Sequence, residues 1–156
     1  ASLPSPRPSS NPDDSAFKLP REMYDRLFPH QRIGVAWMWS LHNTVAGGIL
    51  GDDMGMGKTF QTTCFLSGLF GSKHGTTALV LAPKSVLRTW ERELRAWLAP
   101  ALQGKRPLAL RVVTSETPAK LRRELQGRAA RAARVGSCSV FVATYGMAAH
   151  FTPEKA

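Results

Sequence analysis

The sequence predicts an α/β fold in which helices cover both faces of a mainly parallel sheet. Apolar segments of strand length alternate with segments of helical apolar spacing between residues 48 and 145, the pattern typical of strand–helix–strand units. The segment 77–82 is apolar without polar alternation, as expected of a strand covered on both faces. A glycine-rich loop at residues 51–57 joins the first strand to the next helix.

The elements can be placed in order along the chain. Pro29 suits the first turn of a helix, and Ile33, Trp37 and Leu41 then form an apolar stripe, before Gly47 and Gly48 end the helix. Four strands are expected at residues 48–50, 77–82, 108–114 and 139–145. Helices are expected at 58–70, at 118–134, and at 86–98, where the buried side should hold Val86, Leu87, Trp90, Leu94 and Trp97 or Leu98.

Length and composition fit one ordinary domain. The chain has 156 residues, of which 43% are hydrophobic, enough for a core. Residues 1–20 contain five prolines and five serines, so we expect a flexible leader there and ordered structure over residues 21–156. No run approaches the roughly 18 apolar residues of a membrane span, so no membrane partner is expected. Cys64 and Cys138 lie far apart, and we expect two reduced, inert thiols and no zinc site.

The charge is strongly basic and concentrated in one segment. The formal net charge is +10, which points to an anionic partner such as nucleic acid or, alternatively, to biased codon usage. Between Lys105 and Arg134 nine basic residues stand against two acidic ones. The helix expected at 118–134 could contact phosphates through Arg128, Arg131 and Arg134, or it could be a solvated outer helix.

The strongest chemical signal is the loop before the helix at 58–70. Gly55 and Gly57 lack a Cβ and allow the backbone to approach a phosphate closely, and the helix N-terminus supplies N–H groups and a positive dipole end. Lys58 can contact the β- and γ-phosphates, and the Thr59 hydroxyl can bind Mg²⁺. Asp52 stands where the general phosphate-loop pattern has a glycine, and it more plausibly shapes the loop with Asp53 than acts in catalysis. The alternative is a glycine-rich turn without a ligand.

With the loop written out, Asp-Asp-Met-Gly-Met-Gly-Lys-Thr at residues 52–59, the chain resembles the SWI/SNF-type DNA-translocase ATPases of helicase superfamily two, and Gln61 also fits that family. Residues 27–37 resemble its Q-motif region, 79–87 its motif Ia and 140–145 its motif Ib. The loop and residues 65–68 are most similar to the Cockayne-syndrome-B-like and checkpoint helicase branch.

The resemblance implies an incomplete first RecA-like lobe of a phosphate-loop NTPase over residues 21–156, with ATP and Mg²⁺ as cofactors and Lys58 as the catalytic residue. It implies that Gln31 hydrogen-bonds adenine and that Thr59 holds Mg²⁺. The full set of implied nucleotide contacts is Gln31, Asp52, Met54, Gly55, Met56, Gly57, Lys58, Thr59 and Phe60. It implies double-stranded DNA, which could be nucleosomal, against Pro83, Lys84, Ser85, Thr144 and Tyr145, in a nuclear chromatin-remodelling or DNA-repair motor.

Two other functions stay open. The family carries an Asp-Glu-x-His box soon after motif Ib, and the sequence up to Ala156 lacks it, so the chain could be a non-catalytic nucleotide- or DNA-binding module. Another phosphate-loop enzyme, such as a kinase, is the third reading, and Gln31 with the motif Ia and Ib segments argues against it. His30, Trp37 and Trp90 are interpreted as packing residues.

Overall fold

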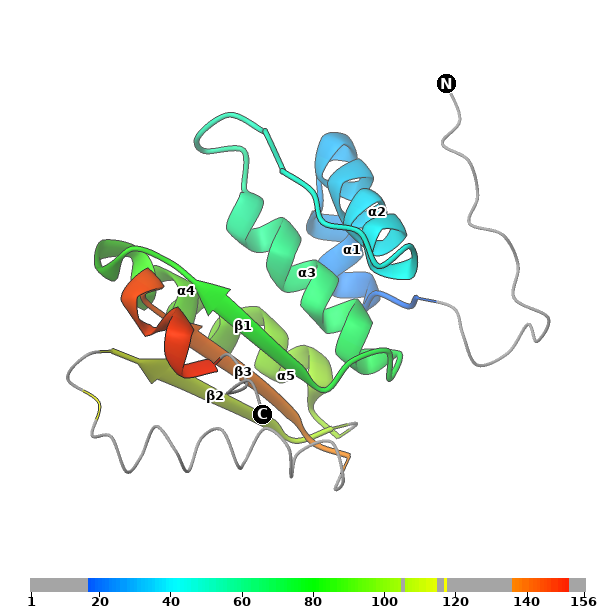
Figure 1. The fold of residues 1–156 in the computed structure, drawn as a ribbon. Helices are drawn as coiled ribbons and strands as arrows, with labels where there is room; N and C mark the ends of the chain where they lie inside the picture. Colours follow the sequence, from blue (N-terminus) through cyan, green and yellow to red (C-terminus); the bar gives the residue numbers. More distant parts are fainter. Residues whose placement is uncertain (1–16, 105, 115–116, 118–135, 152–156) are drawn as a thin grey trace. The chain divides into compact units, whose positions relative to one another are not determined.

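The computed structural model describes residues 17–104, 106–114, 117 and 136–151. The chain divides into two compact units, Ala1–His74 and Gly75–Ala156, and each is described by itself. The first unit is helical, and the second contains a sheet with its helices (Figure 1). The leader predicted over residues 1–20 lies mostly outside the described residues, as does the arginine-rich helix predicted at 118–134.

The first unit contains α1 (Arg21–Arg26), α2 (Pro29–Asn43) and α3 (Lys58–Gly71). Pro29 opens α2 as predicted, and the side chain of Gln31 reaches back to accept a hydrogen bond from the Phe28 N–H at 3.0 Å. This contact satisfies one of the backbone donors that a helix N-terminus leaves unpaired. The helix ends at Asn43, four residues before the predicted glycine pair.

The apolar stripe predicted on α2 is wrong at Ile33, which is 53% exposed. The buried residues of this helix are Gln31, Gly34 and Val35, because the helix turns its Gln31–Gly34 side toward the start of α3. Trp37 and Leu41 are half-buried, and the backbone of Gly48 lies directly against both of their side chains. Two of the three buried positions on this helix, Gln31 and Gly34, are therefore not apolar, which an apolar pattern cannot reveal.

The helix predicted at 58–70 is confirmed as α3, most of which is buried. The short buried strand predicted at 48–50 is wrong: these residues are not in a strand, and Ile49 is 90% exposed. A strand exists only through a hydrogen-bonded neighbour, and within the described residues this segment pairs with none. Residues 45–57 form a loop from α2 to α3 instead (Figure 1).

An aromatic cluster closes the other end of the first unit. The Phe17 ring stacks on Trp39 at 5.0 Å and on Phe65 at 6.1 Å between centroids, and it lies directly over Gly68 of α3. A side chain at position 68 would occupy the space of this ring. The chain before α1 is thereby held to both longer helices of this unit.

The second unit is a parallel sheet of three strands in the order β1-β3-β2, confirming the predicted α/β class (Figure 1). The strands are β1 (Thr77–Leu81), β2 (Leu108–Val113) and β3 (Cys138–Ala143), close to the predicted segments. Every residue of β3 is buried, as expected of a central strand. Since the register pairs Leu81 and Val113 with Ala143, all three strands end at the same edge.

The helix predicted at 86–98 is part of a longer helical segment. It runs as η1 (Lys84–Val86), α4 (Leu87–Glu93), η2 (Leu94–Leu98) and α5 (Ala99–Leu102), with a π-helical turn at η2. Leu87, Leu94 and Leu98 are buried as predicted, whereas Val86 is 38% exposed. A last short 3₁₀ element, η3 (Tyr145–Phe151), follows β3. Among the described residues, none of the helices is both long and apolar enough to cross a membrane.

Candidate functional site

The glycine-rich loop turns into α3 through two left-handed glycines. Gly55 has φ 87° and Gly57 has φ 78°, a conformation that costs other residues about 1–2 kcal/mol. Gly57 is the N-cap of α3 and offers no side chain as a cap. In the described part of the chain no hydrogen bond is found for the N–H groups of Gly57, Lys58 and Thr59. The start of a 14-residue helix thus presents unused donors beside a glycine-containing loop, a setting that binds anions.

The Lys58 ammonium folds back over the same loop. Its Nζ donates to the backbone carbonyl of Asp53 at 2.9 Å and to that of Asp52. An ammonium has three donors and is a mobile point charge, and here two of the donors are used by carbonyls of the chain itself. A phosphate at this helix end would have to compete with those carbonyls for the ammonium.

The threonines at the start of α3 differ in what their hydroxyls do. Thr62 and Thr63 donate to the carbonyls of Lys58 and Thr59, each at 2.9 Å, and so bond within their own helix. For the half-buried Thr59 hydroxyl no hydrogen bond is found within the described residues. Its oxygen is the kind of hard ligand that Mg²⁺ prefers. The residues at this helix end therefore fit a magnesium-bound polyphosphate.

Two glutamines converge on one carbonyl of the loop. The Gln31 Nε2 donates to the Met56 carbonyl at 3.0 Å, and the Gln61 Nε2 reaches the same oxygen at 3.4 Å. Gln61 also donates to Asp52 Oδ2 at 2.9 Å. Gln31 is only 6% exposed. Its amide oxygen accepts from the Phe28 N–H and its amide nitrogen donates to the Met56 carbonyl, so both ends of the amide are engaged within the chain. Its contact with adenine stays a prediction.

The other predicted nucleotide residues differ in exposure. Met54 is 98% exposed and the side chain of Met56 is partly exposed, while Phe60 is half-buried on the first turn of α3. The structure therefore brings Gln31, Asp52, Met56 and Lys58 together. Gln61, which the sequence suggested only as a family match, belongs to the same cluster.

The five residues predicted to contact DNA lie together at one edge of the sheet. Pro83, Lys84 and Ser85 follow the end of β1, and Thr144 and Tyr145 follow the end of β3. The two strands are parallel neighbours, and the Ala82 N–H donates to the Ala143 carbonyl at 2.9 Å. Pro83, Lys84, Ser85 and Tyr145 are exposed. This edge is where open parallel sheets place their ligand-binding loops.

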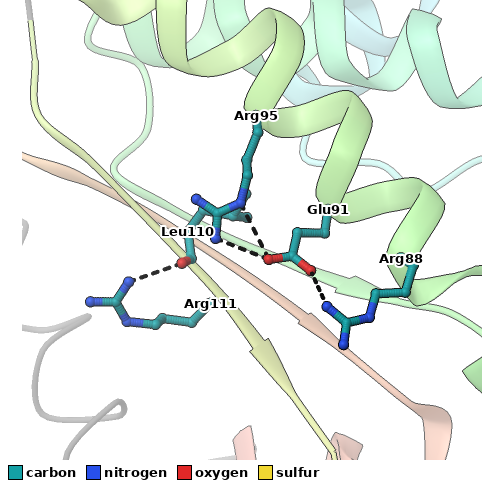
Figure 2. Close-up of polar contacts among 5 residues, drawn as sticks. All are labelled: Arg88, Glu91, Arg95, Leu110 and Arg111. Carbon is teal, nitrogen blue, oxygen red and sulfur yellow. Dashed lines mark hydrogen bonds and ion pairs between the residues drawn. The ribbon is translucent and has the colours of Figure 1, made fainter.

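A group of arginines beside this sheet was not identified from the sequence. Arg88, Arg92 and Arg95 are exposed along α4 and η2 and line an open hollow with Glu91 and Ala96. Figure 2 shows Glu91 accepting from Arg95 at 2.9 Å and from Arg88 at 3.4 Å, while Arg111 of β2 bonds the Leu110 carbonyl. Basic residues are most dense at 105–134, but the spacing of Arg88, Arg92 and Arg95 already indicates one face of a helix.

Both cysteines are free and fully buried. Burial raises the pKa of the Cys64 thiol to about 12. Burial also raises the pKa of Cys138, against the opposing effect of the positive charge on Arg106. Since the thiolate is the reactive form, neither side chain is prepared for nucleophilic chemistry. Among the described residues no group of three His, Cys, Asp or Glu side chains could hold a metal ion.

Comparison with known proteins identifies relatives over most of the chain. The family model described as "SNF2-related domain" matches residues 30–150. Protein CHROMATIN REMODELING 24 of Arabidopsis thaliana is 54% identical over 79 residues, which are 51% of this chain and 7% of that protein. DNA excision repair protein ERCC-6 of Homo sapiens is 40% identical over 98 residues, covering 56% of this chain and 7% of that protein. The chain thus matches less than a tenth of the length of these relatives.

Proposed function

Because the chain belongs to the SNF2-related domain family, we propose that it is the ATP-binding part of an ATP-dependent DNA translocase. Its relatives include proteins named for chromatin remodelling and for DNA excision repair, in agreement with the Cockayne-syndrome-B-like branch. In this proposal residues 21–156 contribute to the first RecA-like lobe of the motor. The whole protein would act on double-stranded DNA, including nucleosomal DNA, in the nucleus.

One observation carries the ATP-binding proposal. The N-terminus of α3 offers unused N–H groups at Gly57, Lys58 and Thr59, together with a mobile ammonium and an unengaged hydroxyl. The backbone donors would hold phosphate oxygens, and Lys58 would leave the carbonyls of Asp52 and Asp53 to contact the β- and γ-phosphates. Bound Mg²⁺ would neutralise phosphate charge, and Thr59 would be its ligand from this chain.

For this chain we propose nucleotide binding, and for the whole protein hydrolysis. In this proposal the residues at the loop bind and orient the phosphates. A non-catalytic nucleotide- or DNA-binding module remains the alternative function. A longer protein containing this sequence would decide between them, because only the motor would turn over ATP in a DNA-dependent manner.

The DNA-binding part of the proposal is supported by the loops after β1 and β3. Pro83, Lys84 and Ser85 place backbone and side-chain donors next to Thr144 and Tyr145 at one exposed edge. Groups of this kind, including hydroxyls and a lysine, contact phosphates and fix the register of a protein on the duplex. The five residues include no arginine, asparagine or glutamine, the side chains with planar groups suited to bidentate base contacts, so we propose contacts that do not depend on sequence.

Calorimetric titration of the 156-residue chain with Mg·ATP tests the proposed function. We expect saturable binding to wild type, weaker binding of Mg·ADP and no binding of AMP, because the phosphates supply the contacts. Lys58→Ala should lower the ATP affinity at least about tenfold, since a charge-assisted contact is lost. Lys73→Ala, which removes an exposed lysine away from the loop, is the matched control and should bind as wild type. Equal ATP binding by Lys58→Ala and wild type would contradict the proposal.

A further inference from the structure

Gln61 is a fully buried polar side chain at the start of α3. It is 0% exposed, and its Nε2 donates to the Asp52 carboxylate at 2.9 Å and to the Met56 carbonyl at 3.4 Å. Asp52 stands near the beginning of the phosphate loop, and Met56 stands four residues later, near its end. One amide group therefore ties the beginning of the loop to its end.

The same amide leaves its oxygen without a partner. The buried Gln61 Oε1 accepts no hydrogen bond within the described residues, and it lies directly against the Cα of Gly34 on α2. A buried acceptor without a donor is destabilising. Turning the amide over would aim Oε1 at the Asp52 carboxylate and lose both donor contacts. The orientation is therefore fixed by the loop, at a cost in stability that points to a functional reason.

The Met56 carbonyl that Gln61 contacts controls the next N–H group. In a trans peptide the carbonyl of one residue and the N–H of the next point in opposite directions. Gln61 and Gln31 hold the Met56 carbonyl from the side of the two helices, so the Gly57 N–H is directed away from them. That N–H is the first of the unused donors at the start of α3.

We propose that Gln61 is a positioning residue for nucleoside-triphosphate binding. It acts through Asp52 and Met56, and it fixes the Met56–Gly57 peptide so that the Gly57 N–H faces the site of the phosphates before the nucleotide arrives. This inference rests on the proposed function, since it assumes that the loop binds phosphates. Preorganised donors bind a ligand more tightly because no ordering cost remains.

Position 61 requires a side chain that has both the length of glutamine and its amide N–H donor. Glutamate would place a second carboxylate against Asp52, and like charges at this distance repel. Asparagine is one methylene shorter, and methionine has the right length without a donor. Exchanging the two groups, as in Asp52→Asn with Gln61→Glu, restores a single amide–carboxylate hydrogen bond with its direction reversed.

The experiment measures Mg·ATP affinity and melting temperature for the 156-residue chain as wild type, Asp52→Asn, Gln61→Glu and the double variant. We expect Gln61→Glu to weaken ATP binding about tenfold. Asp52→Asn should weaken binding less than Gln61→Glu does, because Gln61 can still donate to the amide oxygen and to the Met56 carbonyl. The double variant should regain only part of the lost affinity, because it restores the contact to position 52 but not the donor to Met56. Leu66→Val, a buried change one turn beyond Gln61 on α3, is the control for general destabilisation and should leave affinity unchanged.

The possible outcomes separate the two proposals. Unchanged affinity in Gln61→Glu, or a double variant that binds no better than Gln61→Glu, would overturn the positioning role while ATP binding by wild type stood. If Gln61→Glu does not fold, Gln61→Met replaces it and must weaken binding by more than Leu66→Val does at a similar melting temperature. Absence of ATP binding in wild type itself would overturn the proposed function, and the positioning role with it.

Discussion

Gly34 on α2 lies so close to the side-chain oxygen of Gln61 on α3 that a Cβ at position 34 would collide with it. The glycine is buried in the middle of a helix, where its flexibility costs about 1 kcal/mol relative to alanine. Its place is explained by the space that the buried Gln61 amide needs. The contact between the two helices therefore depends on one missing side chain and one buried polar group.

Gly34→Ala should destabilise the chain although alanine favours helix. The added methyl must displace Gln61 or separate the helices, which costs about 1–3 kcal/mol. In a Gln61→Ala background the obstacle is gone, and Gly34→Ala should become neutral or stabilising. Urea denaturation of the two single variants and the double variant measures this coupling, which should exceed about 1 kcal/mol. Thr62→Ala, on the same turn of α3, should be additive with Gly34→Ala, and additivity in the Gln61 pair would contradict the contact.

The sequence predicted the regular elements more completely than the contacts between them. Apolar runs were sufficient to locate β1, β2 and β3, but only the central strand β3 is buried along its whole length, as expected of a strand covered on both faces. The same logic failed on α2, where Gln31 and Gly34 are buried and Ile33 is exposed. Gln31 and Gly34 are not apolar, so hydrophobic spacing misses them, although Trp37 and Leu41 of the predicted stripe do pack against Gly48.

The candidate site was predictable in its chemistry and not in its internal bonding. Glycine, lysine and threonine at the start of a helix identified the phosphate loop, and the structure places Gly57, Lys58 and Thr59 there. Nothing in the spacing indicated that Lys58 bonds the loop carbonyls or that Gln61 bonds Asp52. Such contacts depend on the path of residues 45–57, and that path departed from the strand expected at 48–50.

Gly57→Ala should cost more stability than Gly55→Ala. Both residues have a left-handed φ, so each substitution carries a similar conformational penalty of about 1–2 kcal/mol. A Cβ at position 57 would also collide with the Gln31 Nε2, whereas position 55 faces open space. We expect the free energy of unfolding to fall by about 1 kcal/mol more at position 57, because the hydrogen bond from Gln31 to Met56 contributes about that much. Thermal or urea unfolding measures both variants.

The Gln31→Ala background provides the control for this comparison. Without the glutamine amide, the extra cost of Gly57→Ala should disappear and the two glycine positions should become equivalent. An extra cost that persists in that background would show that the Gln31 contact is not its cause.

Cys64 should make the stability of the chain fall in alkaline solution. Its pKa is raised by burial to about 12 in the folded chain, against about 8.5 for an exposed thiol in an unfolded one. The thiol is fully protonated in both states at neutral pH, so this part of the stability is present there. Above about pH 9 only the unfolded state loses the proton, and the free energy of unfolding should fall by about 1.4 kcal/mol per pH unit for this group.

The measurement compares urea unfolding of wild type and Cys64→Ala between pH 8 and 11. Deprotonation of lysines affects both proteins equally, so the difference in slope isolates the thiol. Iodoacetamide should modify Cys64 in the native chain only as fast as the chain opens. Identical pH slopes, or rapid alkylation of the native protein at pH 8, would be inconsistent with the burial of this thiol.

Arg88, Arg92 and Arg95 should contribute to DNA binding through charge alone. The three guanidinium groups are exposed on one helical segment, and Glu91 balances only part of their charge (Figure 2). Each phosphate contact releases counterions and adds about 0.9 to the slope of log K against log salt. Changing all three arginines to glutamine should therefore weaken binding to a short DNA duplex of mixed sequence and lower the slope by about 2–3.

The control variant loses the same amount of positive charge at positions elsewhere in the chain. Arg21, Arg26 and Lys73 are exposed in the first unit, and changing them together to glutamine also removes three positive charges. If Arg88, Arg92 and Arg95 contact phosphates, only their replacement lowers the salt slope, because long-range attraction changes equally in both variants and is screened within about 10 Å at 0.1 M salt. Equal slopes for the two triple variants would mean that the arginines act through net charge and do not touch the duplex.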